Sequence, residues 1–185
     1  MSVWRKLIFA SNNVQFRIQM KKTTTDEELI SEWKTIPTRI RKSIRGLSEE
    51  DLNVKGGSEG WTIRETVHHL VEANLVASNM IIAALAVDGC DYDWTWVNPD
   101  KAWMRRVGYD TADIDLAIKA LLALSRHISA LLAANTRTLA RTVKLNDAPG
   151  RPRYVASIRK ILCDEVEHAK EHLGEIRNTR KVRPA

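Results

Sequence analysis

Two histidines, His168 and His172, lie four residues apart in the segment DEVEHAKEH at 164–172. On a helix, residues with this spacing project from the same side, so both imidazoles would point in one direction. A third histidine, His69, lies about a hundred residues earlier in another helix-like segment. Imidazole nitrogens are ligands for zinc, nickel, copper and iron(II). The pattern predicts that these three residues hold one divalent metal ion between two helices.

Glu165 lies one helical turn before His168, on the same side of the segment as the apolar seam residues. Burying a carboxylate and two imidazoles without partners would cost several kcal/mol, so these groups must satisfy one another or share a cation. Glu165 is therefore a candidate fourth ligand, a hydrogen-bond acceptor behind a ligand, or a general base. Two alternatives stay open: Glu165 is tied to another helix, or the histidines are packed without a metal.

Three protein ligands leave a divalent ion with an open position, as in catalytic rather than closed structural zinc sites. In that position the ion could lower the pKa of a bound water or thiol. The remaining candidate groups are expected to be structural. His68 shares its helix face with polar residues and is predicted to point to solvent or to the rim of the bundle, and His127, Cys90 and Cys163 have no suitable partner nearby in sequence.

Four long amphipathic segments must position these residues. Capping boxes predict helix starts at Thr25 and Thr62, Asp110 is the expected cap of a third helix, and the last helix is predicted over about 155–179. Residues 88–109, which contain several tryptophans, and 141–154 are predicted to be long loops. Since no strand-like alternation extends beyond a few residues, the sequence predicts an all-α fold, a four-helix bundle with long crossover connections. Asn74 is the one polar residue on the inner stripe of the second helix.

The chain has 185 residues, of which 44% are hydrophobic and 28% charged, as expected for one globular domain. We assign 1–22 to a basic, poorly ordered extension, 23–180 to the bundle and 181–185 to a tail. The net charge of +6 is concentrated at the two ends, which favours solvated tails and no nucleic-acid partner. Two cysteines and the lack of a long uninterrupted apolar run predict a cytoplasmic protein with no membrane partner.

Three segments together resemble the DinB/YfiT-like superfamily. Residues 60–70 resemble its second-helix signature, with Trp61 eight positions before His69; residues 168–176 resemble its last-helix signature; and residues 46–52 are similar to the turn after its first helix. The resemblance covers roughly 26–179. It implies a four-helix bundle, often dimeric, with a three-histidine site for zinc, nickel or another divalent ion such as iron or manganese.

Characterised relatives are often transferases or isomerases that use a low-molecular-weight thiol. The resemblance therefore implies a metal-dependent transferase that uses a thiol such as bacillithiol or mycothiol on an electrophilic small molecule, acting as a homodimer. The chain departs from those transferases at Glu171, where histidine is common, and added negative charge should raise the pKa of a metal-bound thiol. A non-catalytic metal-binding bundle and a metal-dependent hydrolase with Glu165 as base are the alternative functions.

Overall fold

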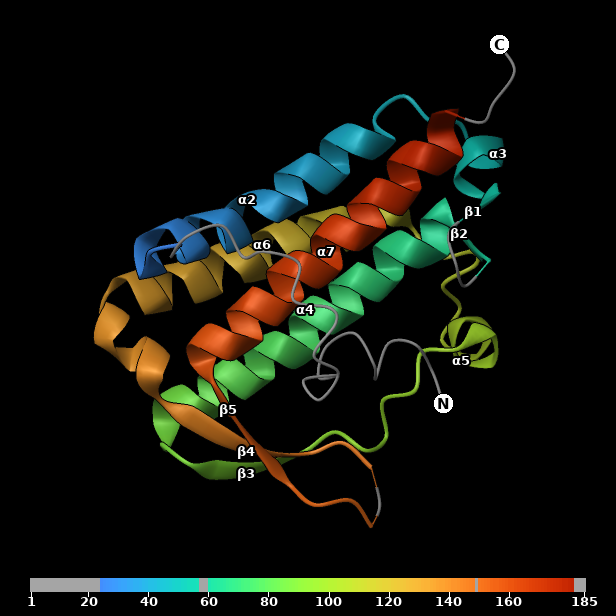
Figure 1. Ribbon diagram of the computed structural model, residues 1–185. Coiled ribbons are helices and arrows are strands. Elements are labelled where there is room, and N and C mark those ends of the chain that lie inside the picture. The colour runs from blue at the N-terminus through green and yellow to red at the C-terminus, as the bar shows by residue number, and fades with distance from the viewer. Residues whose placement is uncertain (1–23, 57–59, 149, 182–185) are drawn as a thin grey trace.

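Four long helices form the body of the computed structural model, which describes residues 24–56, 60–148 and 150–181. They are α2 (Asp26–Ile44), α4 (Ile63–Ala86), α6 (Ile114–Ala133) and α7 (Ile158–Lys181). The predicted four-helix bundle is confirmed (Figure 1). The predicted N-terminal extension 1–22 and tail residues 182–185 lie outside the described residues, whereas Lys181 is the last residue of α7.

The helices run in two opposed pairs: α2 and α7 point one way and α4 and α6 the other (Figure 1). Helix α2 packs against α6 and α7, and α4 packs against the same two helices. Since α4 and α6 are parallel, the chain must cross the length of the bundle between them, as predicted. Large apolar side chains from all four helices fill the centre, each worth roughly 1.5–3 kcal/mol when fully buried. The largest include Trp33, Ile40, Leu70, Ile81, Leu121, Ile128, Leu132 and Ile158.

Capping side chains define where the helices begin. Thr25 and Thr62 each form the predicted capping box, in which the threonine hydroxyl accepts from the amide three residues later. The third helix is capped by Asp113, which accepts from the Asp115 and Leu116 amides, so the prediction of Asp110 was wrong. A turn at Gly108, whose φ is 78°, occupies the intervening residues and delays the helix.

The two long connections contain strands that the sequence analysis placed in loops. The first holds β3 (Cys90–Asp93) and α5 (Lys101–Arg106); the second holds η1 (Thr136–Ala140), β4 (Thr142–Asn146) and β5 (Tyr154–Ser157), so α7 begins three residues later than predicted. Strand β4 pairs parallel with β3 and antiparallel with β5. Each strand has only four or five residues, too few to show a periodic pattern. The partners β3 and β4 are also separated by about fifty residues in the chain.

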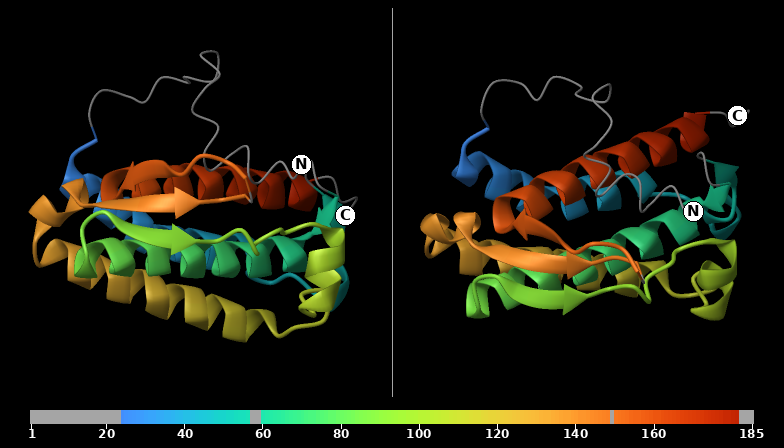
Figure 2. Two further views of the ribbon diagram at one scale, coloured as in Figure 1. Left: turned by 90° about the horizontal axis from the view of Figure 1, so that it is seen from below. Right: turned by 60° about the horizontal axis from the view of Figure 1, so that its bottom comes forward.

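The small elements lie at the two ends of the bundle. The three-stranded sheet lies on one side of the bundle where α4 ends and α7 begins (Figure 2). At the other end lie α3 (Glu49–Leu52), α5 and the hairpin of β1 (Lys55–Gly56) and β2 (Trp61–Thr62) (Figure 1). The hairpin packs on α7 and leads directly into α4. It therefore fixes the start of one histidine-bearing helix against the end of the other.

Two helices are long and apolar enough to span a membrane when judged by length and composition alone. These are α4 and α6, with 18-residue windows of mean hydropathy 1.4 and 1.5. The α4 window is 61% buried inside the bundle, which accounts for its apolar character, whereas the α6 window is only 39% buried. Leu116 and Leu131 of α6 are 61% and 41% exposed, and Leu75 and Ile82 of α4 are 50% and 41% exposed. Apolar side chains thus remain on the outer faces of both helices.

Candidate metal centre

The three predicted histidines meet between α4 and α7. His69 Nε2 lies 3.1 Å from His168 Nε2, and one ring nitrogen from each of His69, His168 and His172 lies within 4.8 Å of the others. The three ring centroids are 4.7–5.1 Å apart. All three side chains are buried, His69 completely. Antiparallel packing brings the first third of α4 beside the middle of α7, so residues a hundred positions apart share one site.

Carboxylates hold two of the imidazoles from behind. His168 Nδ1 donates to Glu165 Oε2 at 3.1 Å, and His172 Nδ1 donates to Glu175 Oε2 at 2.7 Å. Because an ionised carboxylate can only accept, each contact places the ring proton on Nδ1 and leaves a lone pair on Nε2. Glu165 therefore acts as an acceptor behind a ligand in this geometry. Glu175 was missed, although its position three residues after His172 mirrors that of Glu165 before His168.

Burial keeps the cluster in the form that binds metal. Burial lowers the pKa of His69 well below its ordinary 6.5, and the nearby His168 and His172 lower it further. Burial also lowers the pKa of His172, and the Glu175 hydrogen bond only partly opposes that effect. A neutral imidazole is the form that ligates a metal, so the lowered pKa values of His69 and His172 favour metal binding by these two residues.

The residues present fit a divalent cation. Two nitrogens bound at 2.0–2.1 Å to a tetrahedral zinc are about 3.3 Å apart, close to the 3.1 Å between His69 Nε2 and His168 Nε2. Three imidazole nitrogen donors suit zinc, nickel or iron(II) better than calcium or magnesium, which prefer oxygen. The carboxylate behind His168 and the one behind His172 reproduce the carboxylate–histidine pairing that usually orients metal-ligating imidazoles.

Trp61 closes one side of the cluster. Its ring centroid lies 4.7 Å from that of His69 and 5.7 Å from that of His172, onto which it stacks at 24°. The β1–β2 hairpin carries Trp61, and Gly56 of that hairpin lies so close to α7 that a Cβ there would come within 1.8 Å of Thr179 Oγ1. The tryptophan is therefore set by a tight contact between hairpin and helix. The spacing between Trp61 and His69 is visible in the sequence, but the stacking on His172 depends on the fold.

His68 is buried on the opposite side of α4, so the prediction that it points to solvent or the rim was wrong. Its Nε2 lies 3.2 Å from the Ala112 carbonyl oxygen, and its ring stacks on Tyr109 at 5.0 Å. One turn on, Glu72 Oε1 accepts from Trp103 Nε1 at 2.9 Å. The connection between α4 and α6 covers this face of α4. His68 and Glu72 are therefore buried, although the sequence pattern placed them on a polar face.

The remaining candidate residues lie apart from the histidine cluster. Burial raises the pKa of the Cys163 thiol, which makes it a poor nucleophile. Cys90 lies on β3 at the sheet, and His127 is exposed on α6. Among the tryptophans, Trp94 is buried in the core and Trp96 is 59% exposed. The positions of Cys90, Cys163 and His127, away from the histidine cluster, agree with the prediction that these three residues are structural.

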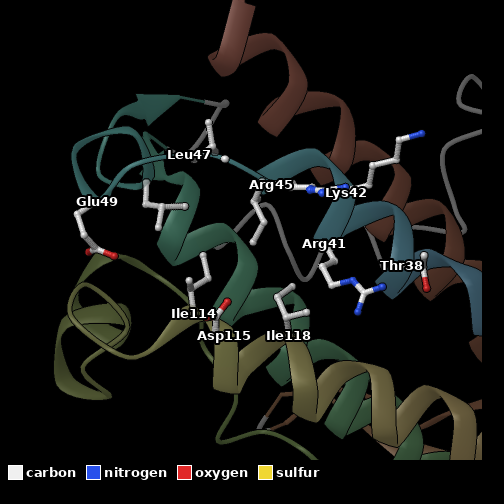
Figure 3. Close-up of a pocket in the computed structure, with 12 residues that line it drawn as sticks. Thr38, Arg41, Lys42, Arg45, Leu47, Glu49, Ile114, Asp115 and Ile118 are labelled. Carbon is white, nitrogen blue, oxygen red and sulfur yellow. The ribbon is translucent and has the colours of Figure 1, made fainter.

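Two surface grooves flank the last turns of α2. One, of about 720 Å³, lies between α2 and α6; Figure 3 shows Arg41, Lys42 and Arg45 beside Ile114 and Ile118. The other, of about 690 Å³, lies between α2 and α7 and is lined by Arg39, Lys42, Ser43, Arg177, Arg180 and Lys181. Neither groove is lined by a residue of the histidine cluster. The second adjoins the segment of α7 that follows His172.

Fold and site together define a four-helix bundle with a buried three-histidine centre for a divalent metal. The chain belongs to the DinB superfamily, whose family model matches residues 32–176. It is 27% identical over 159 residues to "Putative metal-dependent hydrolase GK0616" of Geobacillus kaustophilus, which covers 84% of each chain. It is 26% identical over 153 residues to the similarly named OB0782 of Oceanobacillus iheyensis, which covers 80% of this chain and 82% of the relative.

The bundle also matches a solved structure. YfiT from Bacillus subtilis, described as "a probable metal-dependent hydrolase with an unusual four-helix bundle topology", superposes with a TM-score of 0.73 over 95% of this chain and 97% of YfiT. The two chains are 19% identical, so this likeness shows the fold. It confirms the predicted bundle with its long crossover, while the family model confirms the predicted superfamily.

Proposed function

We propose that this protein is a metal-dependent hydrolase of small molecules in which His69, His168 and His172 hold a divalent ion, zinc before nickel, iron or manganese. The observation that carries the proposal is the convergence of three buried imidazoles, two of them held from behind by Glu165 and Glu175. A divalent ion with three protein ligands supplies Lewis-acid chemistry and lowers the pKa of a water in its open position. The names of the two relatives support the same reaction class.

The chain's own residues have distinct parts in this proposal. Glu165 and Glu175 hold the Nδ1 protons of His168 and His172, so that the Nε2 lone pairs stay directed at one point. Glu165 is therefore a positioning residue and not the general base. Trp61 stacks on His172 and keeps water from that side of the site. Burial of all three imidazoles strengthens each electrostatic interaction within the site.

A second candidate is transfer of a low-molecular-weight thiol, such as bacillithiol or mycothiol, to an electrophilic small molecule. One observation favours it: the groove between α2 and α7 carries five cationic side chains and lies on the part of α7 that follows His172. Such a surface suits an anionic cofactor. Glu165 and Glu175 add negative charge near the metal position and would raise the pKa of a bound thiol and of a bound water alike, so the activity assay must decide between the two reactions.

Metal content and a two-armed activity assay test the proposal. The purified protein should hold about one zinc or nickel ion per chain. His69→Ala should abolish this, whereas His127→Ala, which alters an exposed histidine of α6, should not. The zinc- and nickel-loaded protein is then assayed with a panel of esters and amides, and separately with thiols and monochlorobimane. Hydrolysis that needs His69 supports the hydrolase; thiol conjugation that needs His69, without hydrolysis, assigns the transferase. A wild-type chain without metal refutes both.

We also propose that the protein is a cytoplasmic homodimer without nucleic-acid or membrane partners. The exposed apolar side chains on the outer faces of α4 and α6, above all Leu75 and Leu116, support a second copy as the partner. A surface of this kind in a helical bundle is readily buried by a symmetric contact. Multi-angle light scattering of the purified protein measures the mass directly; a monomer at all concentrations contradicts the homodimer.

A further inference from the structure

A small cavity lies at the centre of the bundle, one helical turn from the histidine cluster. Residues from all four helices line it, among them Trp33 of α2, Asn74 of α4 and Glu165 of α7. Its volume is about 10 Å³. A single water molecule needs about 10–15 Å³ on this measure, so the cavity is large enough for one water and too small for an organic ligand.

Polar groups on the cavity wall need a partner that the described residues do not supply. Trp33 is 2% exposed, and its indole N–H has no hydrogen-bond acceptor among the described residues. Asn74 Oδ1 lies 3.5 Å from Ser125 Oγ, an arrangement that leaves its amide N–H groups as donors. Glu165 uses one carboxylate oxygen for His168, and its side chain also borders the cavity. The wall thus offers two donors and one charged acceptor.

We propose that one buried water occupies this cavity and couples Asn74 and Trp33 to Glu165, which makes both of them positioning residues for the ligand His168. The water accepts from the Trp33 indole N–H and an Asn74 amide N–H and donates to the Glu165 carboxylate. Three hydrogen bonds are typical of a buried water in a globular protein. The chain of contacts then runs from Ser125 through Asn74, the water and Glu165 to the imidazole. This inference rests on the proposed metal site.

The water adds a second anchor to a carboxylate that His168 holds through one oxygen. Outer partners of a metal ligand commonly change metal affinity 10- to 100-fold when they are removed. Asn74 is the one polar residue that the sequence places on the inner stripe of its helix. Coupling to Glu165 explains why position 74 is polar. A leucine there would fill the same space and would leave no buried polar group in need of a partner.

A double-mutant cycle on zinc affinity, measured by chelator competition, tests the coupling. Asn74→Leu should weaken zinc binding about tenfold and Glu165→Gln at least as much, with the double variant no weaker than Glu165→Gln alone. Losses that multiply in the double variant overturn the proposal. Ser78→Ala, one turn along α4 and equally buried, is the control and should bind zinc like the wild type.

Two further measurements keep the proposal testable if Asn74→Leu folds poorly. Trp33→Phe keeps an aromatic side chain and removes the N–H together with two ring carbons, so it should weaken zinc binding while changing the visible spectrum of the cobalt(II)-substituted protein; unchanged affinity and spectrum overturn the proposal. A crystal structure at about 1.5 Å should show one water within hydrogen-bond distance of Trp33, Asn74 and Glu165. If the wild type binds no metal, the proposed function is refuted. If a crystal structure of the zinc-bound protein shows no water in the cavity, only this inference is refuted.

Discussion

Replacing Glu72 with glutamine should stabilise the protein above neutral pH and leave its stability nearly unchanged in acid. The carboxyl group is 8% exposed, and only Trp103 donates to it; Oε2 has no partner among the described residues. Burial raises the pKa of Glu72 from its ordinary 4.5 to about 7, against the opposing hydrogen bond from Trp103. Glutamine keeps the acceptor for Trp103 and carries no charge.

The direction of this pH effect follows from how many protons Glu72 binds in the folded and in the unfolded protein. Between pH 4.5 and about 7 the folded protein keeps the Glu72 proton while the unfolded chain has released it. The free energy of unfolding therefore falls as pH rises through this window and stays low above it. Each pKa unit between the unfolded value of 4.5 and the folded value of about 7 is worth about 1.4 kcal/mol. The free energy of unfolding therefore falls by about 3 kcal/mol in total. The glutamine variant should be more stable than the wild type by about that amount at pH 8 and by little at pH 4.

Urea unfolding of both proteins at half-unit steps from pH 4 to pH 8.5 measures this difference. Glu65→Gln, on the same helix, is the matched control with the opposite sign. Burial raises the pKa of Glu65, but the hydrogen bonds from Lys101 and Thr62 outweigh it and lower the pKa overall. That variant should lose stability at pH 7, and the loss should shrink as pH falls below 4.5. A Glu72→Gln effect that is the same at pH 4 and pH 8 would refute the assignment of a buried, nearly neutral carboxyl.

Three other substitutions probe the site, the hairpin and the outer helix face. Glu175→Gln should weaken zinc binding about tenfold in chelator competition, because it alters the acceptor behind His172; wild-type affinity would show that this carboxylate does not orient the ring. Gly56→Ala should cost about 1–3 kcal/mol in urea unfolding, because its Cβ would meet Thr179, and Thr179→Ala should recover part of that loss; no loss would mean that the hairpin shifts freely. Leu116→Glu should turn the proposed dimer into a monomer in light scattering, and a persistent dimer would place the interface elsewhere.

Short-range sequence signals were sufficient to predict the four long helices and to select the candidate metal ligands. The capping boxes at Thr25 and Thr62 and the 3.6-residue apolar periodicity predicted the helices of the bundle because these signals act within one or two turns. The same periodicity put His69 on an inward face, which the structure confirms by its complete burial. Glu165 was singled out because a carboxylate on the seam of a helix needs a partner, and in the structure that partner is His168.

Only the tertiary structure decided which groups meet. Strands β3 and β4 pair across some fifty residues, so no local pattern could reveal them, and His68 is buried only because the α4–α6 connection folds over it. The cavity shared by Trp33, Asn74 and Glu165 exists because four helices converge there. A sequence specifies what each side chain can do within its own helix; burial and partnership depend on the packing of segments far apart in the chain, and that packing is what gives the imidazoles and carboxylates their chemistry.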